Sequence, residues 1–369
     1  MNAEILPDMS YVWRSILAGR SVLSKGVRFQ VGKGDNVSIW HDPWLPLPYS
    51  FKPFSLPIKG TENWKVGDLI DHDNHVWLNT MVSELFSATE AEIILKIPLS
   101  VWAINDRSIW HYDKTGIYNV KSGYHIAQLS DTLTTHTSSS VGTSGEVNLL
   151  WAKLWKTNVP PKVRAFICFS KTHAIHPPLP KSKKRVLSHW NLPPSGRLKI
   201  NFDGAFRVDI GRGGIGVVVR DEWGECLASL QRSIPFLSSV IHAEAEACRA
   251  ALLVAIDQGW ENLLVETDCA TLVAALTKPD DDFSDIGWII SDCKELITSF
   301  NFISIKHVYR EANVVAHCLA HNASFSLVDE FCLGENPSII EDILIEDCFR
   351  CTWGFGSLSP SDHNRTSCI

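Results

Sequence analysis

From residue 197 onward, the pattern of apolar and polar positions predicts strands and helices in a regular order. Three strands come first, then a helix, and then strands and helices in alternation. The predicted strands are 198–206, two within 213–234 joined at Asp221–Gly224, 262–268 and 302–309, and the predicted helices are 242–259, 269–276, 286–300 and 311–323. This order predicts an α/β fold with a mixed sheet over residues 197–325.

The first 129 residues show another pattern, rich in aromatic and turn residues. RFQVGKGDNVSIW (28–40) alternates on both sides of a Gly-Lys-Gly-Asp-Asn turn and predicts a hairpin. IWHYDKTGIYNV (109–120) predicts a second hairpin, and SGYHIAQL (122–129) predicts the start of a helix. The Gly-Lys-Gly turn lacks the spacing of a phosphate-binding loop and a following helix, so we interpret it as a plain turn. We therefore expect a small α+β region at 1–129.

Composition divides the chain further. The segments are 1–129, a Ser/Thr/Gly linker at 130–147, two apolar helices at 148–175, a Pro/Lys linker at 176–196, the α/β domain at 197–325 and an acidic tail at 326–369. No run of about 18 apolar residues predicts a membrane span, and the N-terminus does not have the pattern of a signal peptide. We expect an intracellular protein, in the nucleus or cytoplasm and not secreted, with reduced cysteines.

Charge is distributed unevenly along the chain. Residues 1–196 carry 21 Lys and Arg against 15 Asp and Glu, whereas 197–325 carry 11 against 18 and 326–369 carry 2 against 8. A nucleic-acid partner needs a cationic surface. If the chain binds nucleic acid, we expect the N-terminal half to supply that surface.

Three acidic residues lie where a sheet-based metal site would place them. Asp203 lies on the first strand, beside Gly204, and Asp268 ends the strand 262–268, at the carboxyl edge where sites form in α/β sheets. Helical spacing puts Glu244 on the apolar stripe that faces the sheet, whereas Glu246 shares a mixed face with Arg249 and is expected to pair with it. A carboxylate on a buried face needs a cation or a hydrogen-bond partner, and a divalent metal shared by the three acids would satisfy it.

At these residues the chain resembles a known family. KINFDGAF, GGIGVVVRD, AEAEACRAAL, VETDC and KHVYREANVVAHCLA match, in order and spacing, the ribonuclease H-like domains of plants and of retrotransposon reverse transcriptases. The resemblance covers 197–325. It implies a ribonuclease H fold, two Mg²⁺ ions (with Mn²⁺ as a substitute) and hydrolysis of the RNA strand of an RNA–DNA hybrid. No membrane partner is implied, and protein partners are unknown.

The resemblance also implies roles for single residues. Asp203, Glu244 and Asp268 match the family's first three catalytic, metal-binding carboxylates, and His307 matches a loop histidine that assists proton transfer or product release. The fourth carboxylate falls at His317, a poor ligand for Mg²⁺. This histidine either takes part in the site or belongs to a polar helix face. The candidate contacts to nucleic acid are Gly204, Gly213, Gly214 and Asn313.

Two functions from different classes remain open at this point. The first is a Mg²⁺-dependent nuclease for RNA–DNA hybrids, favoured by the three carboxylates. The second is a catalytically weak or inactive nucleic-acid-binding or interaction module, a remnant of a retroelement, favoured by His317 and the acidic surface.

The region before the α/β domain has a resemblance of its own. Residues 1–129 resemble the region after the polymerase in non-LTR retrotransposon proteins, and 148–175 resemble the opening of a reverse-transcriptase zinc-binding region. The His and Cys ligands that should follow are absent, so we expect no zinc there. A single Cys348-x-x-Cys351 motif has no second pair to complete a zinc ribbon.

Overall fold

The computed structural model describes residue 10 and residues 19–47, 50–135, 188–326 and 329–353. Its elements in the N-terminal part are β1 (Val27–Gln30), η1 (Val66–Leu69), β2 (Ile70–Asp71), β3 (Val76–Trp77), α2 (Asn79–Leu85), α3 (Ala88–Leu95), β4 (Arg107–Trp110) and α4 (Val120–Thr135). The later elements are β5 (Leu198–Arg207), β6 (Arg212–Arg220), β7 (Cys226–Ile234), α7 (Val240–Asp257), β8 (Asn262–Thr267), α8 (Ala270–Thr277), α9 (Gly287–Ile297), β9 (Phe302–His307), η2 (Arg310–Ala312), α10 (Val314–Ser326), β10 (Asp329–Leu333) and α11 (Ser338–Trp353).

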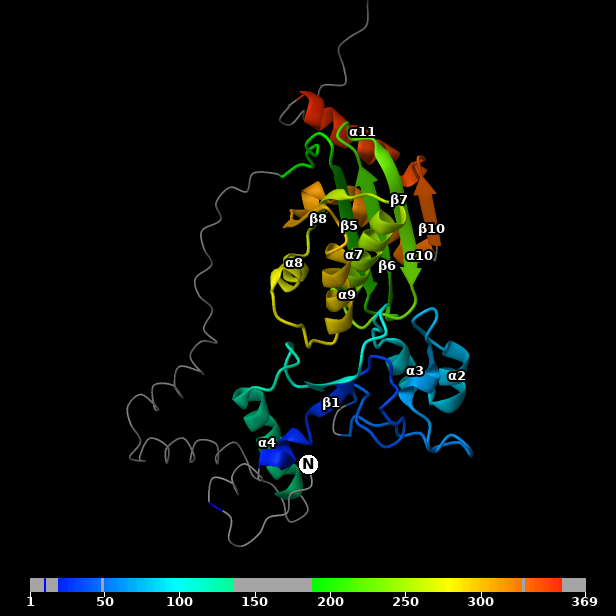
Figure 1. Ribbon diagram of the computed structural model, residues 1–369, viewed down its shortest axis with the longest axis vertical. Coiled ribbons are helices and arrows are strands. Elements are labelled where there is room, and N and C mark those ends of the chain that lie inside the picture. Colours follow the sequence, from blue (N-terminus) through cyan, green and yellow to red (C-terminus); the bar gives the residue numbers. More distant parts are fainter. Residues whose placement is uncertain (1–9, 11–18, 48–49, 136–187, 327–328, 354–369) are drawn as a thin grey trace, which may run out of the picture. The chain divides into compact units, whose positions relative to one another are not determined.

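A six-stranded sheet in the order β10-β7-β6-β5-β8-β9 forms the centre of the later part (Figure 1). The pairs from β10 to β5 are antiparallel, whereas β8 and β9 lie parallel to β5. The turn from β6 to β7 includes Gly224 at φ +87°, a conformation that glycine adopts at little cost. The predicted α/β class and mixed sheet are confirmed, including the helices that separate the parallel strands.

Alternation along β5 assigns its side chains to two different layers. Ile200 and Phe202 are buried in the main core with the apolar stripe of α7 and with α9. The intervening Asn201 and Asp203 point to the opposite face, where Asn201 contacts Asn313, directly before α10, and Asp203 contacts His317 of α10. The sheet therefore has α7 and α9 on one face and α10 on the other, and the candidate site lies at β5, between these layers.

Residues 329–353 differ from the acidic tail expected from the sequence. β10 adds an antiparallel strand to the outer edge of β7, with Phe331 opposite Leu230. α11 then buries Ile340 and Leu344 against Val218 of β6. The eight acidic residues suggested a solvated tail, but apolar residues at helical spacing among them form a packed face.

The N-terminal region is built around its own apolar cluster, which includes Trp44, Leu45 and Val66. Both predicted hairpins are wrong. The first is wrong because β1 pairs with β4, about eighty residues away, rather than with residues 37–40. The second is wrong because β4 is followed by turns and then by α4, so residues 117–120 form no partner strand. The helix predicted at 122–129 is confirmed as α4, most of which belongs to a separate compact unit, Tyr124–Leu187. Short alternating segments thus formed strands, but sequence proximity did not identify their partners.

Aromatic and polar contacts connect the N-terminal region to the segment 280–292. Trp288 Nε1 donates to the Val31 carbonyl at 2.6 Å, and Arg28 forms an ion pair with Asp285. The Arg107 guanidinium lies 3.9 Å from the centre of the Trp288 ring and donates to the carbonyl of Asp282. The acidic loop after α8 therefore contacts arginines of the same chain.

Residues 136–187 lie outside the part of the chain that the structure describes. The prediction of two apolar helices at 148–175 without zinc falls there, as do most of the two predicted linkers. Among the described helices, none combines the length and the apolar character that a membrane crossing requires.

Candidate metal centre

Two of the three predicted carboxylates are positioned by neighbouring parallel strands. Asp203 lies in β5, and Asp268 follows the last residue of β8. β5 and β8 pair in parallel up to Asn201 and Glu266, so both strands carry their aspartates just beyond the paired region. Parallel strands end at the same edge of the sheet, and the two carboxylates therefore come together there.

The third carboxylate comes from the first turns of α7. Glu244, Asp203 and Asp268 each offer a carboxylate oxygen, and these atoms lie within 4.8 Å of one another. Glu246 instead accepts two hydrogen bonds of 2.7 Å from Arg249. The structure brings Glu244, and not Glu246, to the two aspartates, as the helical stripe predicts.

Burial and mutual repulsion act on these carboxyl groups. Glu244 is 6% exposed, and burial, followed by the charges of Asp203 and Asp268, raises its pKa to about 9. Burial and the charge of Asp203 also raise the pKa of Asp268. The buried atoms Glu244 Oε2 and Asp268 Oδ1 have no hydrogen-bond partner. A divalent cation fits this set, because it would supply the missing partner and the opposing charge.

His317 lies beside the carboxylates rather than on a separate polar face. Its Nδ1 is 2.8 Å from Asp203 Oδ2, and its Nε2 is 2.7 Å from Arg310 Nη2. A guanidinium only donates hydrogen bonds, so Nε2 is the acceptor and Nδ1 carries the proton that Asp203 accepts. Arg310 carries no role in the sequence-based prediction, although its position seven residues before His317 indicates the same side of a helix.

Asn313 is buried and fully engaged in the fold. It is 1% exposed, its Nδ2 donates to the Phe202 carbonyl at 2.9 Å, and its Oδ1 accepts from Asn201 at 3.2 Å. These bonds fix the start of α10 to β5 close to Asp203. These hydrogen bonds are sufficient to explain an asparagine at position 313, and its predicted contact with nucleic acid stays a prediction.

The three candidate glycines lie at close approaches between chain segments. A Cβ on Gly204 would lie 2.3 Å from the Ala243 backbone of α7, and one on Gly214 would lie 2.5 Å from the Ala320 carbonyl of α10. A Cβ on Gly213 would meet the Ala205 carbonyl at 2.0 Å. Packing accounts for all three, and their predicted contacts with nucleic acid stay predictions. Gly204 in particular permits α7 to bring Glu244 beside β5.

His307 ends β9 rather than lying in a loop. It pairs in register with Thr267, directly before Asp268, and its exposed ring contacts Tyr309 edge to face at 5.7 Å between centroids. It thus lies at the carboxyl edge of the sheet that carries the site. Its role in proton transfer or product release stays a prediction.

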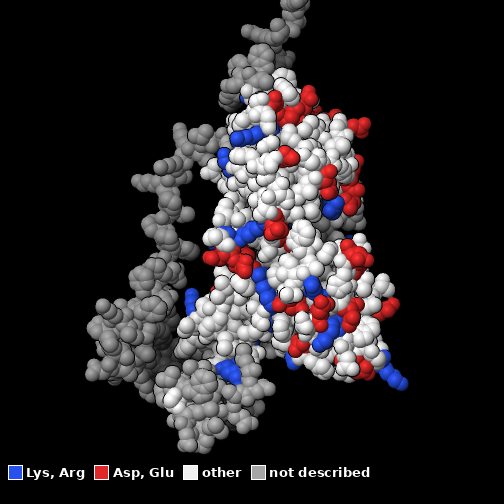
Figure 2. Space-filling view, in the orientation of Figure 1, with Lys and Arg blue, Asp and Glu red and all other residues white. Residues whose placement is uncertain are grey.

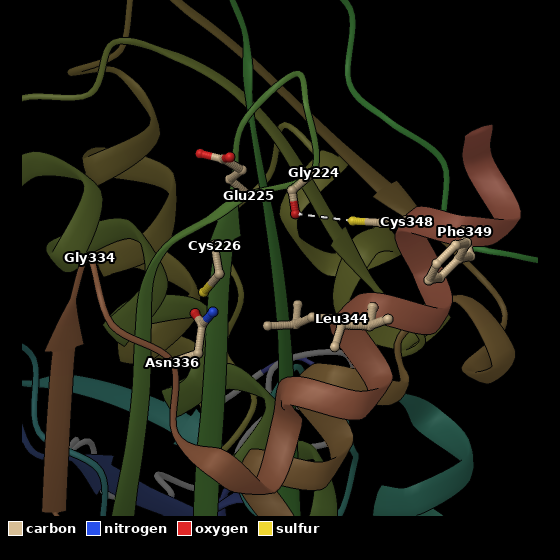
Figure 3. Close-up of a pocket in the computed structure, with 9 residues that line it drawn as sticks. Gly224, Glu225, Cys226, Gly334, Asn336, Leu344, Cys348 and Phe349 are labelled. Carbon is tan, nitrogen blue, oxygen red and sulfur yellow. Dashed lines mark hydrogen bonds between the residues drawn. The ribbon is translucent and has the colours of Figure 1, made fainter.

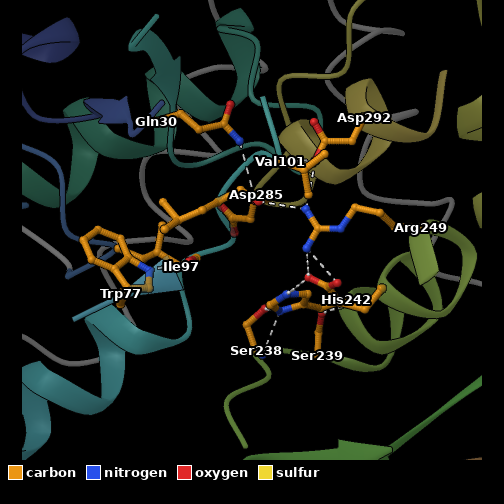
Figure 4. Close-up of polar contacts among 12 residues, drawn as sticks. Gln30, Trp77, Ile97, Val101, Ser238, Ser239, His242, Arg249, Asp285 and Asp292 are labelled. Carbon is orange, nitrogen blue, oxygen red and sulfur yellow. Dashed lines mark hydrogen bonds and ion pairs between the residues drawn. The ribbon is translucent and has the colours of Figure 1, made fainter. Parts of the chain in front are cut away.

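A second polar cluster, which we call the Arg249 cluster, is centred on Arg249 of α7 (Figure 4). Arg249 Nη1 donates to Asp292 Oδ2 and to the Leu99 carbonyl, both at 2.8 Å, while Nη2 contacts Glu246. Although burial opposes it, the charges of Arg249 and His242 lower the pKa of Glu246 to about 2. The sequence predicted the Glu246–Arg249 pair but placed it in water, because the covering residues 99–101 are distant in sequence.

The two cysteines of the Cys348-x-x-Cys351 motif are engaged in hydrogen bonds to backbone carbonyl groups. A cavity of about 490 Å³ lies between α11 and the turn from β6 to β7, lined by Cys226, Leu344 and Cys348 among others (Figure 3). Cys348 donates to the Gly224 carbonyl, and Cys351 donates to the Trp190 carbonyl. Burial raises the pKa of both thiols, which disfavours the thiolate form that binds metal.

The charged surface gives little sign of a nucleic-acid groove on the face shown in Figure 2. Lys and Arg side chains lie scattered among Asp and Glu side chains there, without a continuous basic band. Nine Lys and Arg and no acidic residue occur between residues 151 and 185, which is where the positive balance of the N-terminal half is concentrated. That segment lies outside the described residues.

Comparisons with protein families and curated proteins found similarities over parts of the chain. The family model described as reverse transcriptase-like matches residues 201–323. The Arabidopsis thaliana protein named "Putative ribonuclease H protein" is 30% identical over 164 residues, which are 44% of this chain and 26% of that protein. An uncharacterized mitochondrial protein of the same plant is 44% identical over 52 residues, 13% of this chain and 34% of that protein. The chain thus spans a quarter to a third of these relatives.

Solved structures give a likeness over about a third of the chain. RNase H1 from Halobacterium salinarum is 31% identical and covers 35% of this chain and 97% of its own, with a TM-score of 0.32. LC11-RNase H1 in complex with an RNA/DNA hybrid is 23% identical and covers 35% of this chain and 96% of its own, with a TM-score of 0.32.

Proposed function

We propose that the protein hydrolyses the RNA strand of RNA–DNA hybrids with the help of a divalent metal ion, from the premise that residues 201–323, which match the reverse transcriptase-like family model, form a ribonuclease H-like domain. The observation that carries the proposal is Glu244 Oε2, a buried oxygen without a hydrogen-bond partner, next to two aspartates on parallel strands. Three acidic side chains converge at this point. A cationic cofactor accounts for them.

Asp203, Glu244 and Asp268 would hold the ion, with Mg²⁺ as the expected metal and Mn²⁺ as a substitute. A bound Mg²⁺ would supply Lewis-acid stabilisation of the charge that develops on the phosphate and would lower the pKa of a water that attacks it. The resemblance implies two ions. Around the ion, the buried carboxylates would fix its position and His307, at the same edge of the sheet, would exchange protons with solvent.

The hybrid would be recognised by its backbone and shape rather than by its bases. Contacts to 2′-hydroxyl groups in the shallow minor groove distinguish RNA from DNA, and they carry no sequence information. The predicted contacts at Gly204, Gly213, Gly214 and Asn313 belong to this proposal, although their burial makes direct contact depend on backbone atoms. The main electrostatic attraction would come from the basic segment 151–185.

The alternative is a ribonuclease H-fold module that binds nucleic acid without cleaving it. One observation favours it, the hydrogen bond from His317 to Asp203 at the position of the fourth carboxylate. A neutral donor there supplies no ligand to an ion.

Hybrid cleavage by the full chain, with and without Mg²⁺, decides between the two. We expect Mg²⁺-dependent shortening of the RNA strand and no cleavage by the Asp203→Asn variant. Asp209→Asn, at an exposed acid six residues along the chain, is the matched control and should cleave like the wild type. Binding without cleavage at any Mg²⁺ or Mn²⁺ concentration would favour the non-catalytic module.

A further inference from the structure

We propose that this site binds one divalent ion, and that Arg310 and His317 occupy the place where a second ion would lie. The inference rests on the proposed function only in taking the three carboxylates as ligands of a cation. It departs from the two ions that the resemblance implies.

The three carboxylates converge on a single point. Their ligand oxygens lie within 4.8 Å of one another, and among the residues that the structure describes they are the one group of three or more metal-ligating side chains so arranged. A second ion near Asp203 would need oxygen ligands beyond these three, since Mg²⁺ requires oxygen donors around it. Of the two sides of Asp203, the one toward α7 and β8 is taken by Glu244 and Asp268.

The other side of Asp203, toward α10, is occupied by hydrogen-bond donors. His317 Nδ1 donates to Asp203 Oδ2, and the second ring nitrogen accepts from Arg310. Neither nitrogen of His317 is thus free to bind a metal, and the guanidinium behind it carries a permanent positive charge. A dication placed there would lose ligands and would be repelled by Arg310.

The pair is held in place by the fold. His317 is in the first turn of α10, whose start is fixed to β5 by the buried Asn313. Arg310 lies in η2, directly before that turn, and its charge also reaches Asp268, whose pKa it lowers against the effect of burial. The positive charge of Arg310 therefore acts on Asp268, and its hydrogen bond to His317 connects it to Asp203 through the imidazole.

Counting bound Mn²⁺ in the full chain tests the inference without any substrate. Equilibrium dialysis gives the number of ions per chain at saturation, and the electron paramagnetic resonance spectrum distinguishes an isolated Mn²⁺ from a spin-coupled pair. We expect one isolated ion in the wild type and none in Asp203→Asn. His317→Asp with Arg310→Gln should bind two ions, because it adds an oxygen ligand and removes the repelling charge.

Two further variants separate the effect of a new carboxylate ligand at position 317 from the effect of the positive charge of Arg310. His317→Asn, with no added charge, should still bind one ion. His317→Asp alone should bind the second ion about tenfold more weakly than the double variant, because Arg310 would pair with the new carboxylate. Thermal melting without metal checks that each variant folds, and His317 is 33% exposed on its side chain, so its replacement is tolerable.

The outcomes are distinct from those of the cleavage experiment. Two ions in the wild type, no bound ion in the wild type, or one ion in a folded double variant would each overturn the inference. A chain that binds one Mn²⁺ but cleaves no hybrid would leave the inference standing and contradict the proposed nuclease. A chain that cleaves hybrid with two bound ions would support the proposed nuclease and overturn the inference of a single ion.

Discussion

His317 Nδ1 donates a hydrogen bond of 2.8 Å to Asp203 Oδ2, so a neutral imidazole of α10 contacts the carboxylate of β5 on which the candidate site is centred. This contact relates the replacement of the expected fourth carboxylate by His317 to the chemistry of the site. A carboxylate at position 317 would add a ligand for a metal ion. The imidazole offers Asp203 only a hydrogen-bond donor, because its second nitrogen accepts a hydrogen bond from Arg310. The first prediction follows from this difference.

Replacing His317 with Asp should raise hybrid cleavage about tenfold at low Mg²⁺ and less at saturating Mg²⁺. The added charge lies next to the ion with little water between them, and it therefore tightens metal binding. Cleavage rates measured against Mg²⁺ concentration check this, with His317→Asn as the control that removes the imidazole without adding charge. Superimposable curves for wild type and His317→Asp would mean that position 317 plays no part.

Divalent metal should stabilise the full chain through the three carboxylates. A ligand present at a hundred times its dissociation constant adds about 2.7 kcal/mol to the free energy of unfolding, so Mg²⁺ or Mn²⁺ should raise the melting temperature by several degrees. Asp203→Asn should abolish the rise, and the control Asp209→Asn should keep it. The assignment fails if the metal response of Asp203→Asn equals that of the wild type.

Without metal, stability should fall as pH rises, because of Glu244. Its pKa is raised from 4.5 to about 9 in the fold, so its stabilising contribution is full below pH 4.5 and is lost as pH rises toward 9. The slope is at most about 1.4 kcal/mol per pH unit. Glu244→Gln should reduce this slope, leaving the smaller contribution of Asp268, and should raise the melting temperature of the metal-free chain at pH 7.

The neighbouring Glu246 provides a control of opposite sign. Its pKa is lowered to about 2, so its contribution is full above pH 4.5 and is lost as pH falls from there. Glu246→Gln should therefore destabilise the chain at pH 7. Urea unfolding at pH 5, 7 and 8.5 measures both variants, and an unchanged slope in Glu244→Gln would contradict the raised pKa.

The sequence was sufficient to predict the strands and helices whose apolar positions recur with a regular period over many residues. Ten residues of β5 and eighteen of α7 show clear periods, and helical spacing alone separated Glu244 from Glu246. Strand ends then brought Asp203 and Asp268 together. These inferences held because each rests on one element and on the way that strands end at one edge of a sheet.

The sequence was insufficient wherever a distant segment covers a residue. The pairing of β1 with β4 depends on about eighty intervening residues, and local alternation suggested hairpins instead. Arg249 appeared solvated because nothing near it in sequence shows that Leu99 and Asp292 cover it. The 326–369 segment appeared to be a tail because its acidic residues obscured the apolar positions of α11.

Binding of hybrid should weaken steeply with salt, through the basic segment 151–185. Each cation that neutralises a phosphate contributes roughly 0.7–0.9 to the slope of log affinity against log salt. Changing four cations of this segment to Gln should therefore lower the slope by about 3. The changed residues are Lys181, Lys183, Lys184 and Arg185.

The matched control replaces four exposed lysines of the N-terminal region. These are Lys25, Lys59, Lys114 and Lys121. Fluorescence anisotropy of a labelled hybrid between 50 and 300 mM salt, roughly the range in which such contacts are screened, gives both slopes. Equal losses in the two sets would show that the attraction is distributed over the N-terminal half rather than concentrated in 151–185.

The Arg249 cluster should make a large contribution to stability that an exposed ion pair does not make. Arg249 is the shared partner of Glu246 and Asp292, and Asp292 is fully buried, so Arg249→Met would leave two carboxylates without their counter-charge. Losing one partner of a buried pair costs about 3–5 kcal/mol. Arg232→Met is the control, since Arg232 and Asp329 are 45% and 66% exposed and such pairs contribute about 0–1 kcal/mol. Chemical unfolding of both variants at pH 7 checks the difference. A loss below about 1 kcal/mol for Arg249→Met would mean that water replaces the guanidinium, and that the contacts of residues 99–101 with α7 and α9 do not seal the cluster.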